Sequence, residues 1–244
     1  MCHSTDSRPP APPIQGEVAS QEQIELTAAD GNRFLAYRAD PAEPNGRNVV
    51  ILPDVRGLHP FYRDLAVRFA EAGFRAIAID YFGRTAGLTD RGEDFEYMPH
   101  VNQLKHDQVR ADVRAATDVL AADRGPVFTV GFCLGGALSW RQAAEGNGLA
   151  GGIGFYSTLR FVDDPTTGPG APILGLLGGA DKATTPERLD AYLAALDRTG
   201  TEHEIHVYQG APHSFFDRSY KEWEEVCQDA WRRMLSFTER HSPG

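Results

Sequence analysis

Short apolar runs alternate with longer amphipathic segments from residue 23 onward. The apolar runs predict strands over residues 24–27, 34–38, 49–52, 76–79, 127–130, 152–155, 173–177 and 204–208. Several of these runs are continuous stretches of valine, isoleucine and leucine, which is typical of strands buried on both faces of a parallel sheet. Helices are therefore expected to cover both faces of this sheet.

The amphipathic segments between these runs supply the helices. Apolar residues recur at helical spacing over residues 61–69, 109–120 and 189–196, and a last helix is expected over residues 220–240. The alternation opens with an antiparallel pair around residues 30–32, so it predicts an α/β fold with a mostly parallel sheet of about eight strands. The segment 81–106 has no clear periodicity, and we expect it to form a loop that shapes a pocket.

The composition is that of a globular protein. The 244 residues are 41% hydrophobic and 24% charged, which allows one domain with a full core. We expect this single domain over residues 17–244, preceded by a loose arm over residues 1–16, where four prolines disfavour packed structure. Cys2 and His3 in this arm could touch a metal, but two such residues without further ligands are more often a polar tail.

Charge and cysteine usage narrow the function classes. The net charge of −10, without a basic run, argues against a nucleic-acid partner. The first residues lack the apolar stretch of a secretory leader, and no run reaches the roughly 18 apolar residues of a membrane helix. The three cysteines lie far apart, so we expect free thiols and a cytoplasmic protein that acts on a small molecule.

The strongest local signal is the segment 127–137, where an apolar strand runs through Gly131, Cys133 and Gly135 into a helix. This spacing is typical of the nucleophile elbow of α/β-hydrolases, with cysteine in place of serine. A helix N-terminus favours the thiolate form, and the amide of Leu134 can serve as one half of an oxyanion hole. The alternative is that Cys133 is a small buried residue without a chemical role.

A thiolate nucleophile needs an acid and a base, which α/β-hydrolases present later in the chain, in that order. Asp181 follows the apolar run 173–177, and His213 follows the run 204–208. Each could be an ordinary turn or loop residue, but both are expected at the sheet edge that carries Cys133. Five other histidines are expected to be structural or exposed: His100, His106, His203, His206 and His241. No paired-ligand spacing indicates a metal site.

These motifs resemble those of the dienelactone hydrolase family, in residues 131–137, 178–181 and 210–215. The resemblance implies a Cys133, His213 and Asp181 triad that forms a thioester acyl-enzyme without a cofactor. It also implies that the second oxyanion amide is that of Val55. The acidic residue that the family places near the thiol, typically glutamate, is here Asp54.

One position departs from the family pattern. Dienelactone hydrolases bind a substrate carboxylate with arginines, one of them four residues after the catalytic histidine, where this chain has Asp217. An aspartate there would repel a carboxylate. The neighbouring Arg218, or Arg84 and Arg91 in the long loop, could compensate, although such arginines are more often solvated surface charges.

The sequence therefore predicts a cysteine-dependent hydrolase of small activated esters or enol lactones. Three alternatives remain open: a biosynthetic thioesterase or cyclase on the same scaffold, a non-catalytic protein that binds a small molecule, and a redox-sensing thiol. The last would need a resolving cysteine, and neither Cys2 nor Cys227 is obviously placed for that role.

Overall fold

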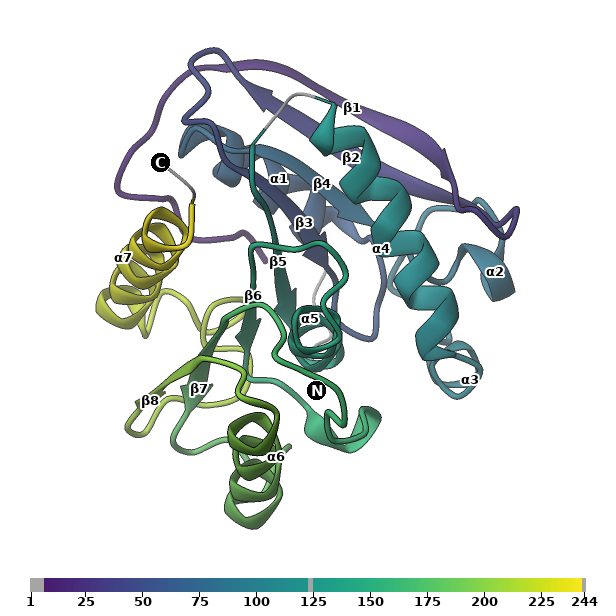
Figure 1. Ribbon diagram of the computed structural model, residues 1–244. Helices are drawn as coiled ribbons and strands as arrows, with labels where there is room; N and C mark the ends of the chain where they lie inside the picture. Colours follow the sequence, from purple (N-terminus) through teal and green to yellow (C-terminus); the bar gives the residue numbers. More distant parts are fainter. Residues whose placement is uncertain (1–6, 123–124, 243–244) are drawn as a thin grey trace.

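A single sheet organises the chain, and this computed structural model describes residues 7–122 and 125–242 (Figure 1). Within these ranges the strands lie in the order β1-β2-β4-β3-β5-β6-β7-β8. They are β1 Val18–Thr27, β2 Arg33–Pro41, β3 Asn48–Leu52, β4 Arg75–Ile79, β5 Val127–Phe132, β6 Gly151–Phe155, β7 Ile173–Gly178 and β8 His203–Tyr208. Only the pairs β1–β2 and β2–β4 are antiparallel, so the predicted mostly parallel sheet with an antiparallel edge is confirmed.

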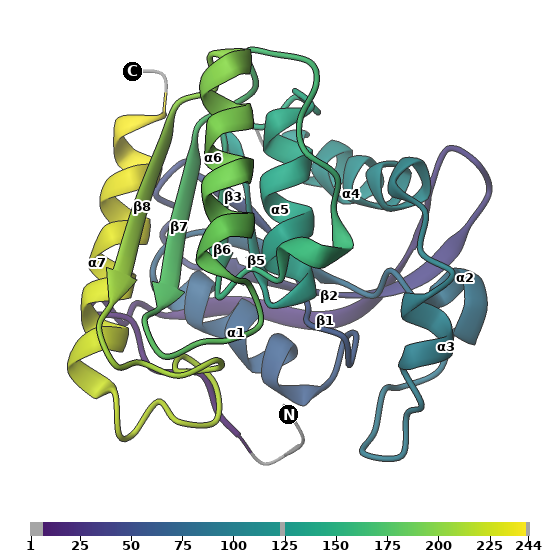
Figure 2. The same ribbon diagram turned by 90° about the horizontal axis from the view of Figure 1, so that it is seen from below.

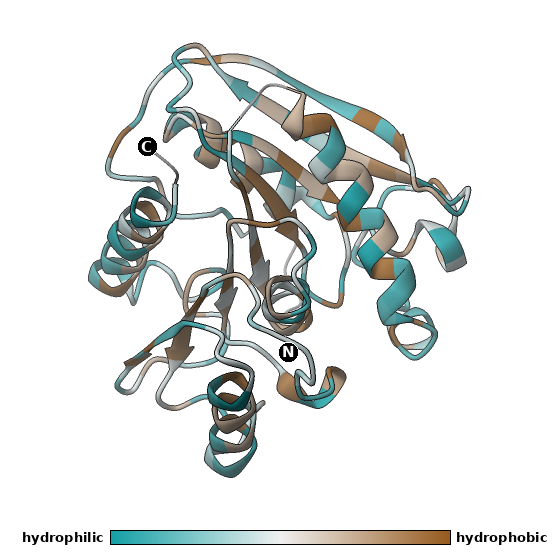
Figure 3. Ribbon diagram, in the orientation of Figure 1, coloured by the Kyte–Doolittle hydropathy of each residue, from teal (hydrophilic) through white to brown (hydrophobic). Residues whose placement is uncertain are grey.

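Helices cover both faces of the sheet, as the continuous apolar strands require (Figure 2). The helices are α1 Pro60–Glu71, α2 Gly83–Ala86, α3 Met98–Val101, α4 His106–Ala121, α5 Leu134–Ala144, α6 Pro186–Thr199 and α7 Glu224–Arg240. One core cluster contains the buried residues of α1 and α7, and a second contains those of α4, α5 and α6. Successive residues of β3 enter opposite clusters, because side chains alternate across a strand. Figure 3 shows the resulting apolar centre.

Strand β1 is longer than the predicted 24–27. Apart from the half-buried Val18, its first half is exposed, and it is polar after Ala19, so it carries little apolar signal. It forms nonetheless because its backbone pairs with β2 from Val18 to Thr27, and backbone hydrogen bonds do not depend on apolar side chains. The last helix begins at Glu224 rather than at residue 220, because turns occupy the residues before it.

Part of the described N-terminal segment packs on the domain, whereas a loose arm is expected over residues 1–16. Trp231 Nε1 on α7 donates to the carbonyl of Pro10 at 3.1 Å, and the amide of Gly16 donates to Glu71 at 2.7 Å. Pro9 and Pro12 are buried. Prolines lose little backbone entropy on ordering, so this segment can pack without regular structure. Residues 1–6, which include Cys2 and His3, lie outside the described residues.

The segment 81–106 contains two short helices, α2 and α3, and Tyr97 and Met98 line the cavity described below. Across residues 7–122 and 125–242, no helix has the length and apolar character needed to cross a bilayer.

Candidate active site

Cys133 sits on a sharp turn between β5 and α5. Its φ of 56° and ψ of −114° place it in a region that residues with a Cβ rarely adopt, at a cost of about 1–3 kcal/mol. The flanking glycines make this turn sterically possible. A Cβ on Gly131 would lie 1.9 Å from the carbonyl oxygen of Gly135, and one on Gly135 would lie 2.1 Å from that of Leu52. The turn brings the thiol to the carboxyl edge of the sheet.

Asp181 and His213 meet at the same edge. Asp181 Oδ2 lies 2.7 Å from His213 Nδ1, and its other oxygen accepts the amide of Ala183 at 2.8 Å. The carboxylate therefore fixes the imidazole through Nδ1, which leaves Nε2 as the nitrogen that can exchange protons with a substrate or thiol. The Tyr156 ring packs against His213 with 4.8 Å between the ring centroids.

A cavity of about 380 Å³ opens over these residues. Four predicted site residues line it together: Val55, Cys133, Asp181 and His213. The other described lining residues are Tyr97, Met98, Thr158, Arg160, Phe161, Lys182 and Ala183. The Cys133 thiol contacts Thr158 Oγ1 at 3.4 Å. A volume of this size accommodates a small ester.

The amides of Val55 and Leu134 are placed to act as donors. Leu134 is the first residue of α5, so its amide has no acceptor within the helix. Among the backbone hydrogen bonds of the described residues, none uses either amide. Both amides thus remain available for an anionic oxygen of a bound substrate.

Asp54 and Asp217 are buried and share one arginine. Arg56 Nη2 lies 2.6 Å from Asp54 Oδ2 and 2.7 Å from Asp217 Oδ2. Burial raises the pKa of Asp54, but attraction and hydrogen bonds from Arg56 outweigh it, so the net pKa lies below the usual value. Asp217 is not among the residues lining the cavity, and Arg56 offsets part of the charge of the two carboxylates. The repulsion of a substrate carboxylate by Asp217 stays a prediction. The thiol-modulating role of Asp54 stays a prediction.

The predicted substrate-binding arginines lie away from the cavity. Arg84 pairs with Asp30 at 2.7 Å and with Asp112 at 2.8 Å, and Arg91 pairs with Asp80 at 2.7 Å. These guanidinium groups are largely buried, and a buried charge requires a partner of opposite sign. They serve ion pairs and do not line the site, contrary to our expectation.

Arg218 also fails to reach the cavity. It is exposed, in the turn that follows Asp217, and is absent from the described lining residues.

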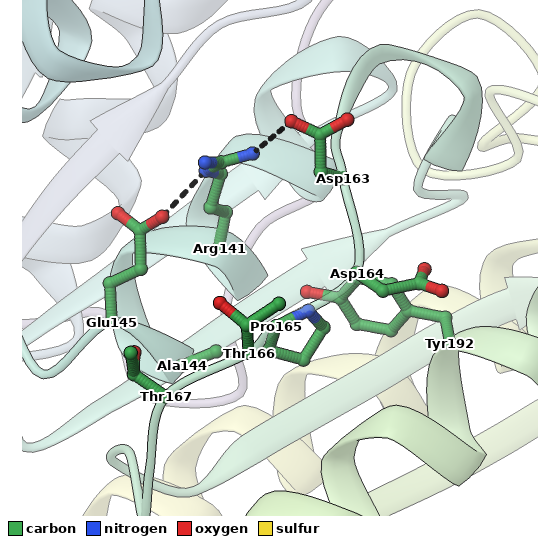
Figure 4. A pocket seen from close by; sticks show the side chains of 9 residues that line it. All are labelled: Arg141, Ala144, Glu145, Asp163, Asp164, Pro165, Thr166, Thr167 and Tyr192. Atoms are coloured by element: carbon green, nitrogen blue, oxygen red, sulfur yellow. Dashed lines mark hydrogen bonds and ion pairs between the residues drawn. The ribbon is translucent and has the colours of Figure 1, made fainter.

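A second cavity, of about 40 Å³, lies elsewhere, between α5, α6 and the segment 163–167 (Figure 4). Arg141 on its wall pairs with Glu145 at 2.8 Å and with Asp163 at 3.2 Å. Its size suits water molecules rather than a substrate. The cavity over Cys133 is the candidate active site because it brings Cys133, Asp181 and His213 together.

Comparison with known proteins identifies the family. The sequence profile of the dienelactone hydrolase family matches residues 34–242, which is most of the chain. The chain belongs to the dienelactone hydrolase family. A carboxymethylenebutenolidase of Rhodococcus opacus is 27% identical over 259 residues, covering 99% of this chain and 97% of the relative. A Yersinia pestis protein assigned the same activity is 28% identical over 231 residues, covering 87% and 86%.

A solved structure supports the same family membership. The crystal structure of a Klebsiella pneumoniae protein assigned as a dienelactone hydrolase matches with a TM-score of 0.71 and 26% identity. The match covers 90% of this chain and 99% of that one.

Sequence reasoning missed Thr158, Arg160 and Lys182. Thr158 and Arg160 follow β6, and Lys182 follows β7, so all three lie beyond the carboxyl ends of strands. Their position after predicted strands could have indicated them, since the loops at the carboxyl ends of strands build the sites of α/β folds.

Proposed function

We propose that this protein hydrolyses small activated esters or enol lactones with Cys133 as nucleophile. The observation that carries the proposal is one cavity that holds the elbow thiol, the His213–Asp181 pair at 2.7 Å and the Val55 amide segment. Membership in the dienelactone hydrolase family supports an ester or lactone hydrolase.

The mechanism has two steps. His213 takes the thiol proton of Cys133, and the thiolate attacks the ester carbonyl carbon. The resulting oxyanion accepts hydrogen bonds from the Val55 and Leu134 amides. The C–O bond then breaks, the leaving alkoxide takes a proton from His213, and a thioester remains. A water molecule, deprotonated by His213, attacks the thioester, and the thiolate leaves with the bonding electron pair.

Leaving-group chemistry sets the substrate class. The tetrahedral intermediate of a simple alkyl ester expels the thiolate more readily than the alkoxide. It therefore mostly returns to substrate. Phenyl and enol esters have better leaving groups, so we expect them to turn over while ethyl esters and amides barely react. Comparable kcat/KM values for ethyl and phenyl acetate would contradict this account.

The cavity walls also restrict substrate charge. Arg160 and Lys182 line the cavity, and Asp181 is the one acid among the described lining residues. Since His213 engages Asp181, the wall favours neutral or anionic substrates over cationic ones.

The test is steady-state hydrolysis of p-nitrophenyl acetate and an enol lactone by the wild type, Cys133→Ala and Cys227→Ala. Cys227 is buried in α7 and contacts the carbonyl of Phe215, so it controls for the loss of a buried thiol. We expect Cys133→Ala alone to abolish turnover. Equal activity in the wild type and Cys133→Ala would overturn the proposal.

A further inference from the structure

The segment 53–57, between β3 and α1, carries the Val55 amide, and hydrogen bonds fix the groups around that amide. The amide of Asp54 donates to Tyr62 Oη at 3.0 Å, and the amide of Arg56 donates to Asp54 Oδ1 at 2.8 Å. The carbonyl of Asp54 accepts from the amide of Gly57 at 3.1 Å and from Tyr81 Oη at 3.0 Å. Tyr81 Oη also donates to the carbonyl of Pro53, so the carbonyls of Pro53 and Asp54 share its single proton.

The bond from Tyr81 acts on the peptide unit that contains the Val55 amide. The carbonyl of Asp54 and the N–H of Val55 belong to one planar trans unit, so they point in opposite directions. A donor held at the carbonyl therefore fixes the direction of the N–H. It also draws electron density from the amide, which makes the N–H a stronger donor through hydrogen-bond cooperativity.

Tyr81 is suited to hold such a bond. It follows β4 directly after Asp80, is 1% exposed, and packs edge-on against Phe82 with 4.9 Å between ring centroids. Burial raises the pKa of its hydroxyl well above the ordinary value, so the group stays protonated and can donate. The ring cannot turn away without disrupting the core.

We propose that Tyr81 is a positioning residue that presets and polarises the Val55 amide for the oxyanion. The inference rests on the proposed function, because it assumes that an oxyanion forms beside Cys133. It assigns a role to a tyrosine that the sequence did not single out and that is not among the residues lining the cavity.

The test compares two reactions of the same thiol. Acylation by p-nitrophenyl acetate builds an oxyanion, whereas alkylation by iodoacetamide displaces iodide at a saturated carbon and builds none. Loss of a whole oxyanion donor costs about 100- to 1,000-fold in rate, so weakening one by Tyr81→Phe should lower kcat about 10-fold. KM and the alkylation rate of Cys133, followed by mass spectrometry of its peptide, should change less than about twofold.

Tyr62→Phe is the matched control, since it removes a hydroxyl of similar burial that bonds the preceding peptide unit. We expect a smaller loss of kcat than in Tyr81→Phe. Replacing Tyr81 with 3,5-difluorotyrosine keeps the ring and makes the hydroxyl a stronger donor, so acylation should be at least as fast as in the wild type.

Three outcomes would overturn the inference. One is wild-type acylation in Tyr81→Phe, another is an equal loss of acylation and alkylation, and the third is slower acylation in the fluorinated protein. Each leaves the proposed function intact if Cys133→Ala is inactive. Full activity of Cys133→Ala would overturn both.

Discussion

At the residue scale, the glycines beside Cys133 matter because no Cβ fits there. Gly135 packs directly on the backbone of Leu52 and Pro53, at the start of the segment that carries Val55. The same glycine thus permits the elbow and sets how closely α5, which begins at Leu134, approaches the segment that carries the Val55 amide.

We expect Gly135→Ala to reduce the free energy of unfolding by about 1–3 kcal/mol, since a Cβ there must displace backbone. Activity should fall further than stability, because the displaced segment carries the Val55 amide. Gly92→Ala is the control, as a Cβ at that position meets nothing within 4 Å. Chemical denaturation and p-nitrophenyl acetate hydrolysis would check both effects. Wild-type kcat in Gly135→Ala would show that the close packing is dispensable.

At the scale of elements, one buried arginine joins the loops that follow β3 and β8. Arg56 belongs to the first loop, and Asp217 lies four residues after His213 in the second. This ion pair holds the segment 53–57, which carries the Val55 amide, at a fixed separation from the loop that carries His213.

Arg56→Met should leave Asp54 and Asp217 as uncompensated buried carboxylates, at a cost of about 3–5 kcal/mol in the free energy of unfolding. The comparison is Arg114→Met, which removes an ion pair to Asp118 whose side chains are more than half exposed. That variant should lose less than about 1 kcal/mol. Urea denaturation measures both losses. Equal decreases in the free energy of unfolding for the two variants would contradict the idea that Arg56 holds the two loops together.

The sequence predicted the parts of the site that follow from strand order. Cys133, Asp181 and His213 each follow an apolar strand, and parallel strands bring such residues to one edge. Arg84 and Arg91 were misread because their partners Asp112 and Asp80 become neighbours only in the folded chain. Thr158 was missed because a threonine after a strand is common in turns and carries no motif.

At the scale of the whole molecule, His59 couples folding to pH. It is 1% exposed, and neither ring nitrogen has a hydrogen-bond partner among the described residues. Burial lowers the pKa of His59 from 6.5 to about 4, despite the attraction of Asp54. The folded protein therefore holds this ring neutral at pH values where the unfolded chain binds a proton.

Above pH 6.5 the His59 ring is neutral in both the folded and the unfolded protein, so it does not lower the free energy of unfolding. As the pH falls from 6.5 toward 4, the unfolded chain binds a proton that the folded protein does not, and the free energy of unfolding decreases. The total loss is of the order of 3 kcal/mol. In His59→Leu, the free energy of unfolding should decline less steeply over this range. Urea denaturation at several pH values gives both slopes. Identical slopes would mean that His59 does not control this dependence.

The most direct test of the central claim is to identify the acylated residue. The protein would be mixed with p-nitrophenyl acetate, quenched in acid within the first turnover, digested and analysed by mass spectrometry. We predict one acetyl group on Cys133, removable by hydroxylamine as a thioester, and none in Cys133→Ala. An acetyl group on another residue, together with undiminished turnover by Cys133→Ala, would contradict the account.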